Sequence, residues 1–254
     1  APASASEAGP APSAPAVEAA SERRSPSASG PATAGASTPT PPRRSRVLLV
    51  GDSMAATDFG RALVQELSGS PRISVRRRGK SATGLARPDY FDWRAEAERL
   101  VARHAPDHVL VILGGNDGQD LVGDGPRVRW GSAGWAEGYL RRMETFVGRL
   151  LDGDGRRRVT WIALPTMARP RLERKLDLIR AVQVRFSEQH PRVGYFELRP
   201  WFYEGDERLR ERVELGGKAY PLRQEDGIHF SRPGAMWLAR QVAPALLERL
   251  RASD

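Results

Sequence analysis

Two short apolar runs, each followed by a glycine, limit most strongly what this chain can fold into. They cover residues 46–50 and 108–113 and end at Gly51 and Gly114. Runs of this length that are rich in Val, Leu and Ile are typical of strands buried on both faces of a parallel sheet. Segments with helical spacing follow them, and such alternation favours a parallel sheet with helices on both faces. The predicted fold is therefore a three-layer α/β/α sandwich around a mostly parallel central sheet.

The rest of the pattern continues the alternation. We expect further strands at 73–75, 159–164 and 193–198, and helices at 59–67, 93–104, 133–151, 170–189 and 231–250. The predicted loop 114–132 is long, and loops of that length are usually functional or mobile. In sheets of this kind, sites form beyond the carboxyl ends of the strands. Residues that directly follow a predicted strand are therefore the first candidates for a site.

The beginning of the chain has a different composition. Residues 1–45 are mostly Ala, Pro, Ser, Thr and Gly, with almost no large apolar side chain. Such a segment cannot bury enough surface to offset the entropy lost on ordering. We expect a disordered linker or tail at 1–45 and a single domain at 46–254. The Ala-Pro-Ala-Ser start is typical of a mature or trimmed product, so a membrane tether upstream of residue 1 would be compatible with it.

Composition also narrows the classes of partner. The net charge is +9, but Lys is rare and the Arg runs 76–78 and 156–158 have no interleaved aromatic residues, so we expect solvated faces and no nucleic-acid partner. The absence of cysteine excludes disulfides and thiol catalysis. Asp226 and His229 lack further ligands at metal-binding spacing, and neither glycine fingerprint of a phosphate site is met. We therefore expect no metal and no cofactor, and the oligomeric state is left open.

Three residues are candidates for nucleophilic catalysis. Ser53 follows a predicted strand and precedes a helix, and a serine hydroxyl attacks an ester only when a base takes its proton. His229 is the candidate base, and Asp226 lies three residues away, where it can fix the imidazole tautomer. Taken alone, Ser53 is read more simply as a helix N-cap, and 226–229 as a turn closed by an Asx hydrogen bond.

Attack on an ester carbonyl creates an oxyanion that needs hydrogen-bond donors. We expect three of them: the backbone N–H of Ser53, the backbone N–H of Gly84 and the side-chain amide of Asn116. Glycine suits this role because backbone must approach the substrate closely. Gly79 is a rival for the role of Gly84.

The combination of these segments resembles a known family. Gly-Asp-Ser at 51–53, Gly84, Gly-Gly-Asn-Asp at 114–117 and Asp-Gly-Ile-His at 226–229 are similar to the four sequence blocks of the SGNH (GDSL-type) hydrolases. The resemblance covers about residues 46–250 and implies the flavodoxin-like SGNH fold, with the residues named above as catalytic triad and oxyanion hole. The stretches 83–93 and 164–169 further resemble a bacterial exported subgroup of unassigned function.

This resemblance implies a serine esterase that removes O-acyl groups, above all O-acetyl, from a cell-envelope glycan in the periplasm or outside the cell. An acylated glycan or a small ester would be its substrate. The residues that could contact the substrate are Asp52, Arg87, Trp93, Asp117 and Arg169. For each of these, an ordinary ion pair or packing role is the simpler interpretation.

Two other functions stay open at this point. A sugar hydroxyl could replace water in attacking the acyl-enzyme, which would make the protein an O-acyltransferase. The fold could also serve as a non-catalytic module that binds or assembles glycans.

Overall fold

In the computed structural model the chain divides into two units, Ala1–Pro41 and Pro42–Asp254. The structure describes residues 43–151, 155–205 and 208–252, all of which belong to the second unit. The linker or tail expected at 1–45 lies outside the described residues, except for 43–45. None of the helices within these ranges is long and apolar enough to cross a membrane.

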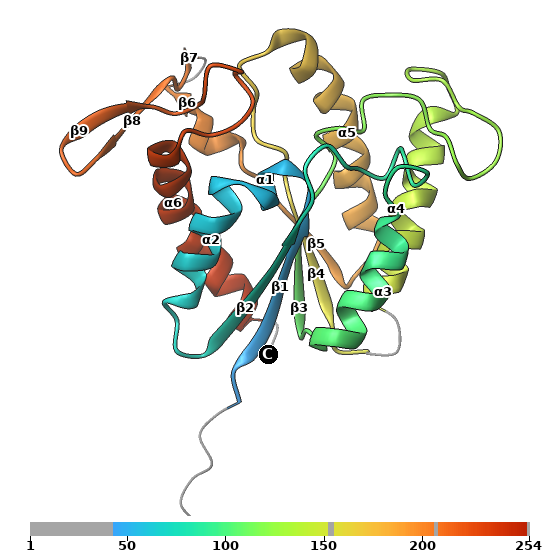
Figure 1. Cartoon of the computed structure of the whole chain (residues 1–254), viewed down its shortest axis with the longest axis horizontal. Helices are drawn as coiled ribbons and strands as arrows, with labels where there is room; N and C mark the ends of the chain where they lie inside the picture. Colours follow the sequence, from blue (N-terminus) through green and yellow to red (C-terminus); the bar gives the residue numbers. More distant parts are fainter. Residues whose placement is uncertain (1–42, 152–154, 206–207, 253–254) are drawn as a thin grey trace, which may run out of the picture. The chain divides into compact units, whose positions relative to one another are not determined.

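Five parallel strands form the central sheet, in the order β2-β1-β3-β4-β5 (Figure 1). Their bounds are β1 (Ser45–Gly51), β2 (Ile73–Gly79), β3 (His108–Ile112), β4 (Arg158–Ile162) and β5 (Val193–Phe196). This order is that of flavodoxin-like doubly wound sheets. The expected parallel sheet is therefore confirmed, and β3 is buried along its whole length, as its unbroken apolar run predicts.

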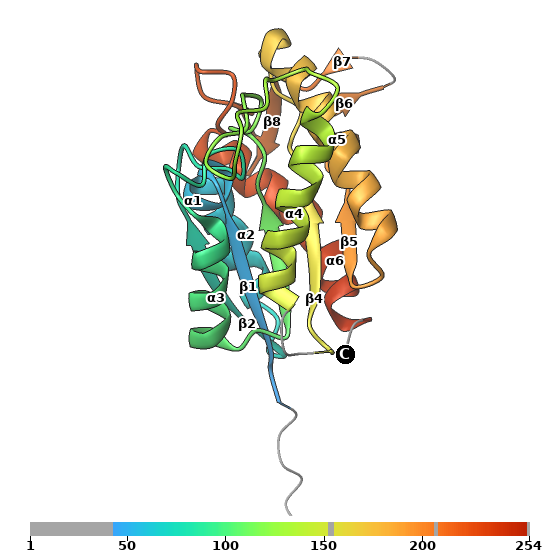
Figure 2. The same cartoon turned by 90° about the vertical axis from the view of Figure 1, so that its right-hand side faces the viewer.

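Helices cover both faces of the sheet, which confirms the three-layer sandwich (Figures 1 and 2). One face is covered by α1 (Ser53–Ala56), α2 (Asp58–Ser68) and α6 (Arg232–Arg251); the other by α3 (Trp93–His104), α4 (Trp135–Leu151) and α5 (Pro170–Gln189). The bounds of α3 and α5 coincide with the predicted ones. Both helices have clear start signals in the sequence, since Asp92 caps α3 and Pro170 opens α5.

A few small elements were not expected. They are the 3₁₀ turn η1 (Arg199–Phe202), the strand pair β6 (Tyr203–Glu204) and β7 (Arg208–Leu209), and the hairpin of β8 (Arg212–Leu215) and β9 (Lys218–Pro221). The β8–β9 turn uses Gly216 and Gly217, both with positive φ (60° and 72°). Two consecutive glycines are a recognised signal for such a hairpin turn, so the β8–β9 hairpin could have been predicted from the sequence.

The register of two neighbouring strands decides where the site lies. Gly51 of β1 pairs with Ile112 of β3, so the chain segments that follow both strands emerge side by side. A Cβ on Gly51 would lie 2.1 Å from the carbonyl oxygen of Ile112, so no other residue fits this close approach without movement of the backbone. Ser53 and Asn116 consequently leave the sheet at the same edge.

Candidate active site

Asp52 ties the segment after β1 to the segment after β3. Its Oδ1 accepts from the backbone N–H of Met54 (3.0 Å) and caps α1, and its Oδ2 accepts from the backbone N–H of Gly115 (3.1 Å). The side chain is buried, with 1% of the residue exposed. Burial raises the pKa of Asp52 to about 7, against the opposing effect of the two N–H donors. Asp52 therefore fixes the positions of its neighbours Ser53 and Asn116.

Asp117 ties the same loop to the turn that contains Gly84. Its carboxylate accepts from the Ala86 N–H (2.7 Å) and from the Tyr139 hydroxyl (2.8 Å), in a fully buried environment that raises its pKa. A Cβ on Gly84 would lie 2.1 Å from Asp117 Oδ1, so the carboxylate occupies the space of any larger side chain. Gly79, the rival glycine, packs instead against α1, where a Cβ would meet the Ala56 nitrogen at 2.3 Å.

Asn116 lies beside the residue that precedes Gly84. Its Nδ2 donates to the carbonyl of Thr83 (2.9 Å), which orients the amide and leaves its second N–H for another acceptor. The Asn116 carbonyl accepts from Gln119 Nε2 (2.6 Å), which fixes the loop from its other side. The half-buried Asn116 amide and the Gly84 backbone are therefore neighbours, as two donors to one oxyanion would have to be.

The turn at 226–229 holds an acid–imidazole pair. Asp226 Oδ2 lies 2.6 Å from His229 Nδ1, and Asp226 Oδ1 accepts from the backbone N–H groups of Ile228 (2.8 Å) and His229 (2.9 Å). Burial disfavours the ionised carboxyl, but these hydrogen bonds outweigh it and lower the pKa of Asp226. When Nδ1 of a neutral imidazole donates, Nε2 carries the lone pair. The pair can therefore accept a proton from a nearby hydroxyl.

Neighbouring segments hold this turn from both sides. Ala168 donates its N–H to the Gly227 carbonyl (3.0 Å), and Arg169 Nε donates to the Asp226 carbonyl (2.7 Å). Gly227 has a φ of +69°, a conformation that glycine adopts without strain. Arg223 adds hydrogen bonds to the carbonyls of Thr166 and Ile228. The segment after β4 is thus part of the support for the imidazole.

The histidine turn packs against the helices that follow the first strand. The ring of Phe230, the residue after His229, packs on Phe59 of α2 with 5.4 Å between centroids. Ser231, two residues after His229, donates its N–H to the Leu222 carbonyl (3.1 Å), which closes the segment that carries the histidine at the start of α6. Figure 1 shows the segment between β9 and α6 above the same edge of the sheet as α1. The half-exposed Ser53 lies at that edge.

Three residues expected to contact substrate do not face an open surface. Trp93 is 1% exposed, and its indole N–H donates to Thr83 Oγ1 (3.0 Å), so the prediction of a substrate contact is corrected to a packing role. Asp52 and Asp117 are likewise buried, and their carboxylates accept the backbone hydrogen bonds that hold the loops together. Arg169 is exposed but committed to the Asp226 carbonyl, whereas Arg87 is exposed and forms a bidentate ion pair with Asp89.

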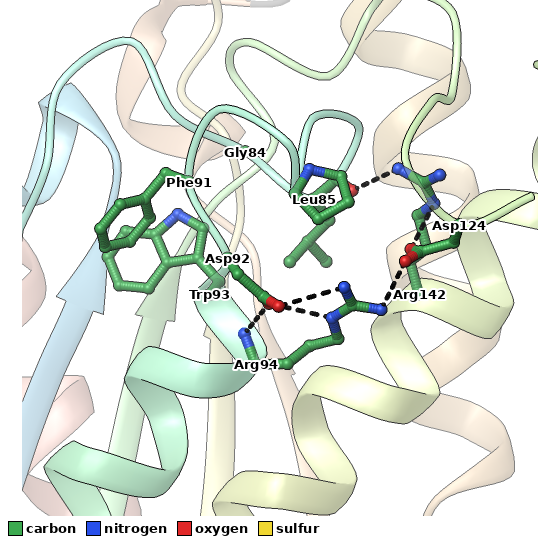
Figure 3. Close-up of a pocket in the computed structure, with 9 residues that line it drawn as sticks. Gly84, Leu85, Phe91, Asp92, Trp93, Arg94, Asp124 and Arg142 are labelled. Carbon is green, nitrogen blue, oxygen red and sulfur yellow. Dashed lines mark hydrogen bonds and ion pairs between the residues drawn. The ribbon is translucent and has the colours of Figure 1, made fainter.

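No sequence pattern indicates a role for Arg142, which binds the turn that contains Gly84 through hydrogen bonds. From α4 its guanidinium donates to the carbonyls of Leu85 (2.8 Å), Ala86 (2.7 Å) and Val122 (2.8 Å). Figure 3 shows Arg142 beside Asp124. A cavity of about 10 Å³, near the lower limit for one water molecule, is lined by Gly84 and Arg142. An arginine in a predicted helix carries no signal of such a role, because its acceptors come from distant loops.

In the part of the chain that the structure describes, no group of three or more His, Cys, Asp or Glu side chains is arranged to hold a metal ion.

Comparison with known proteins gives the family. Residues 46–245 match the family described as "Protein of unknown function (DUF459)". The chain belongs to the DUF459 family. No curated protein matches its sequence.

Solved structures share the fold of this DUF459 protein. A carbohydrate acetylesterase family member from Sinorhizobium meliloti is similar at 15% identity and a TM-score of 0.55, over 82% of this chain and 99% of that one. A carbohydrate esterase family 3 protein from Talaromyces cellulolyticus matches at 13% identity and 0.54, over 82% and 99%. A candidate GDSL-like lipase from Bacteroides ovatus matches at 13% and 0.54, over 83% and 55%. These likenesses confirm the fold that the resemblance to the SGNH (GDSL-type) hydrolases predicts.

Proposed function

We propose that this DUF459 protein is a serine esterase that removes O-acyl groups, above all O-acetyl, from a glycan through an acyl-serine intermediate. The observation that carries the proposal is the 2.6 Å contact between His229 Nδ1 and Asp226 Oδ2, in a turn above the same edge of the sheet as α1, the helix that begins at Ser53. The shared fold with carbohydrate esterases supports the substrate class. The catalytic domain would comprise residues 46–254.

The first half of the reaction forms the acyl-enzyme. Ser53 Oγ attacks the ester carbonyl while His229 Nε2 takes its proton, and Asp226 stabilises the resulting imidazolium without taking the proton itself. The oxyanion accepts hydrogen bonds from the N–H groups of Ser53 and Gly84 and from Asn116 Nδ2. The tetrahedral intermediate collapses, the C–O bond to the sugar breaks, and His229 gives its proton to the departing sugar hydroxyl.

The second half releases the acyl group. Water loses a proton to His229 as its oxygen attacks the acyl carbonyl. The second intermediate expels Ser53 Oγ, which regains the proton from His229, and the carboxylic acid leaves. Because Asp52 and Asp117 hold three backbone segments together, the donors are in place before substrate binds. Such preorganisation is the main source of oxyanion stabilisation.

Acetate release tests the proposal. The wild-type protein should release acetate from 4-nitrophenyl acetate and from O-acetylated xylan, and Ser53→Ala should lose at least about 1000-fold in kcat/KM, since removal of a triad nucleophile leaves only the oxyanion hole and binding. Ser187→Ala is the matched control, because Ser187 lies near the far end of α5 and bonds to the Val184 carbonyl. Equal turnover by wild type and Ser53→Ala would reject the assignment. Acetyl transfer to an added oligosaccharide, faster than hydrolysis, would identify a transferase instead.

A further inference from the structure

The proposed reaction uses one side chain of the long loop between β3 and α4, yet the whole loop is ordered by specific contacts. Leu121 and Val128 pair through two backbone hydrogen bonds (2.9 and 3.0 Å). Asp120 Oδ1 accepts from the backbone N–H of Trp130 (2.7 Å). These hydrogen bonds hold the half-exposed Trp130 in one place.

The Trp130 ring is connected to the Asn116 loop through packed aromatic rings. It meets Trp135 edge to face, with 4.3 Å between centroids, and Trp135 stacks on Tyr139 at 4.9 Å. The Tyr139 hydroxyl in turn donates to the carboxylate of Asp117, the residue after Asn116. Trp130 is therefore rigidly positioned relative to the proposed oxyanion hole.

An open groove of about 650 Å³ lies against Trp130. One wall contains Arg87 and Asp89, which follow Gly84 by a few residues, and another contains Gly118 and Gln119, which follow Asn116. Gln119 donates to the backbone carbonyl of Asn116. The groove is therefore lined by the same loop that carries the proposed oxyanion donor Asn116. Its lining residues are close in sequence to two of the proposed oxyanion donors, Gly84 and Asn116.

The charges that line the groove are almost all paired. Arg87 binds Asp89 through two hydrogen bonds (2.9 and 2.7 Å), and Arg127 Nε donates to Asp120 (2.6 Å). The fifth charge, Lys175, donates to the Gly118 carbonyl (2.6 Å) and lies 5.5 Å from the centre of the Trp130 ring.

This lining suits a neutral, hydroxyl-rich ligand better than an anion. The carboxylates and guanidinium groups of the ion pairs keep lone pairs and N–H groups on their outer edges, which can exchange hydrogen bonds with alternating hydroxyls. The exposed part of the Trp130 indole, which Lys175 and Trp135 do not cover, can pack against the C–H groups of a sugar ring. An anion would instead have to compete with the carboxylates for the two arginines and with the Gly118 carbonyl for Lys175.

We propose that this groove binds a neutral sugar residue of the glycan chain, next to the sugar that carries the ester. The inference rests on the proposed esterase function and narrows its substrate class to oligomers or polymers with a neutral backbone. The enzyme would then favour acetylated oligosaccharides over small acetyl esters, with Trp130 as a residue that determines this preference.

The first test compares two substrates in each variant. The measured quantity is the ratio of kcat/KM for O-acetylated xylohexaose to that for 4-nitrophenyl acetate. Trp130→Ala should lower this ratio about 5- to 30-fold, the effect of removing a well-packed aromatic anchor, mainly through KM for the hexasaccharide. Trp130→Phe should restore most of it. Trp237→Ala is the matched control, because Trp237 is also half-exposed and lies beneath a cation, Arg210, but lies outside this groove.

The second test measures binding without chemistry. In the Ser53→Ala background, unacetylated xylohexaose should bind in a calorimetric titration, and hexagalacturonate should bind more weakly. Addition of Trp130→Ala should abolish the binding of xylohexaose. The melting temperature of the double variant should stay within a few degrees of that of Ser53→Ala. An unchanged substrate ratio in Trp130→Ala, no binding of xylohexaose, or a preference for hexagalacturonate would each overturn the inference. Failure of the proposed function looks different: the wild type would then hydrolyse neither ester, and the binding titration alone would decide the role of the groove.

Discussion

Replacement of Asp52 by asparagine should change how stability depends on pH. Burial raises the pKa of this carboxyl from 3.8 to about 7. The folded protein therefore keeps the proton at pH values where the unfolded chain has lost it. Between about pH 4 and pH 7 the folded state binds more protons, so the contribution of Asp52 to stability is largest at low pH and declines as the pH rises.

The size of this contribution follows from the two pKa values. A tenfold difference in proton affinity corresponds to about 1.4 kcal/mol, so the burial of Asp52 costs the wild type about 4 kcal/mol of stability at pH 8 relative to pH 4. In the Asp52→Asn variant the side chain cannot ionise and escapes this cost. Its amide group would face one of the two N–H donors that Asp52 satisfies, a constant penalty of about 1–3 kcal/mol at every pH.

Urea denaturation of wild type and Asp52→Asn at pH 4.5, 6 and 8, at constant ionic strength, measures the difference. We expect the variant to be less stable than the wild type at pH 4.5 and at least as stable at pH 8. Asp89→Asn is a suitable control, because the hydrogen bond from Arg87 lowers the pKa of Asp89 and its pH dependence has the opposite sign. A stability difference between wild type and Asp52→Asn that stays constant over this range would refute the reasoning.

Two further substitutions test the geometry of the site. Gly84→Ala should destabilise the fold by about 1–3 kcal/mol in a denaturant titration, as overpacking does, because its Cβ would lie 2.1 Å from Asp117 Oδ1. Gly148→Ala is the control, because a Cβ on this glycine of α4 meets open space and should not destabilise the fold. Equal effects of the two substitutions would contradict this account. Asp226→Asn should lower kcat for 4-nitrophenyl acetate about 10³- to 10⁴-fold with little change in fold, because the imidazole takes the wrong tautomer; a loss below about tenfold would exclude Asp226 as the orienting residue.

The fold could be predicted because its elements carry local signals. The apolar runs of β1 and β3, and the starts of α3 and α5, are readable from neighbouring residues alone. The short strand expected at 73–75 instead continues to Gly79, since pairing with β1 extends it beyond its apolar part. Its continuation, Arg76 to Arg78, has a sequence that favours strand only in that tertiary context.

The sequence proposes the reacting groups of the candidate site, but it does not indicate the residues that hold them in place. Ser53, Asn116 and His229 stand in short motifs, each next to a strand end or a helix start. Tyr139 and Arg142 stand in no motif, because their partners lie 20 to 57 residues away in the sequence and are brought near only by packing. The same reason explains the error at Trp93, which packs against Phe146 of α4 and donates its indole N–H to Thr83, contacts that no sequence pattern indicates.

The central claim is that Ser53 is a nucleophile activated by His229. The most direct measurement is the intact mass and peptide map of the folded protein after exposure to a serine-directed fluorophosphonate, in the wild type and in His229→Ala. The account predicts one adduct, located on Ser53, that forms rapidly in the wild type and at least about 100-fold more slowly in His229→Ala. Folded wild-type protein with an unmodified Ser53, or equal labelling rates in both proteins, would contradict it.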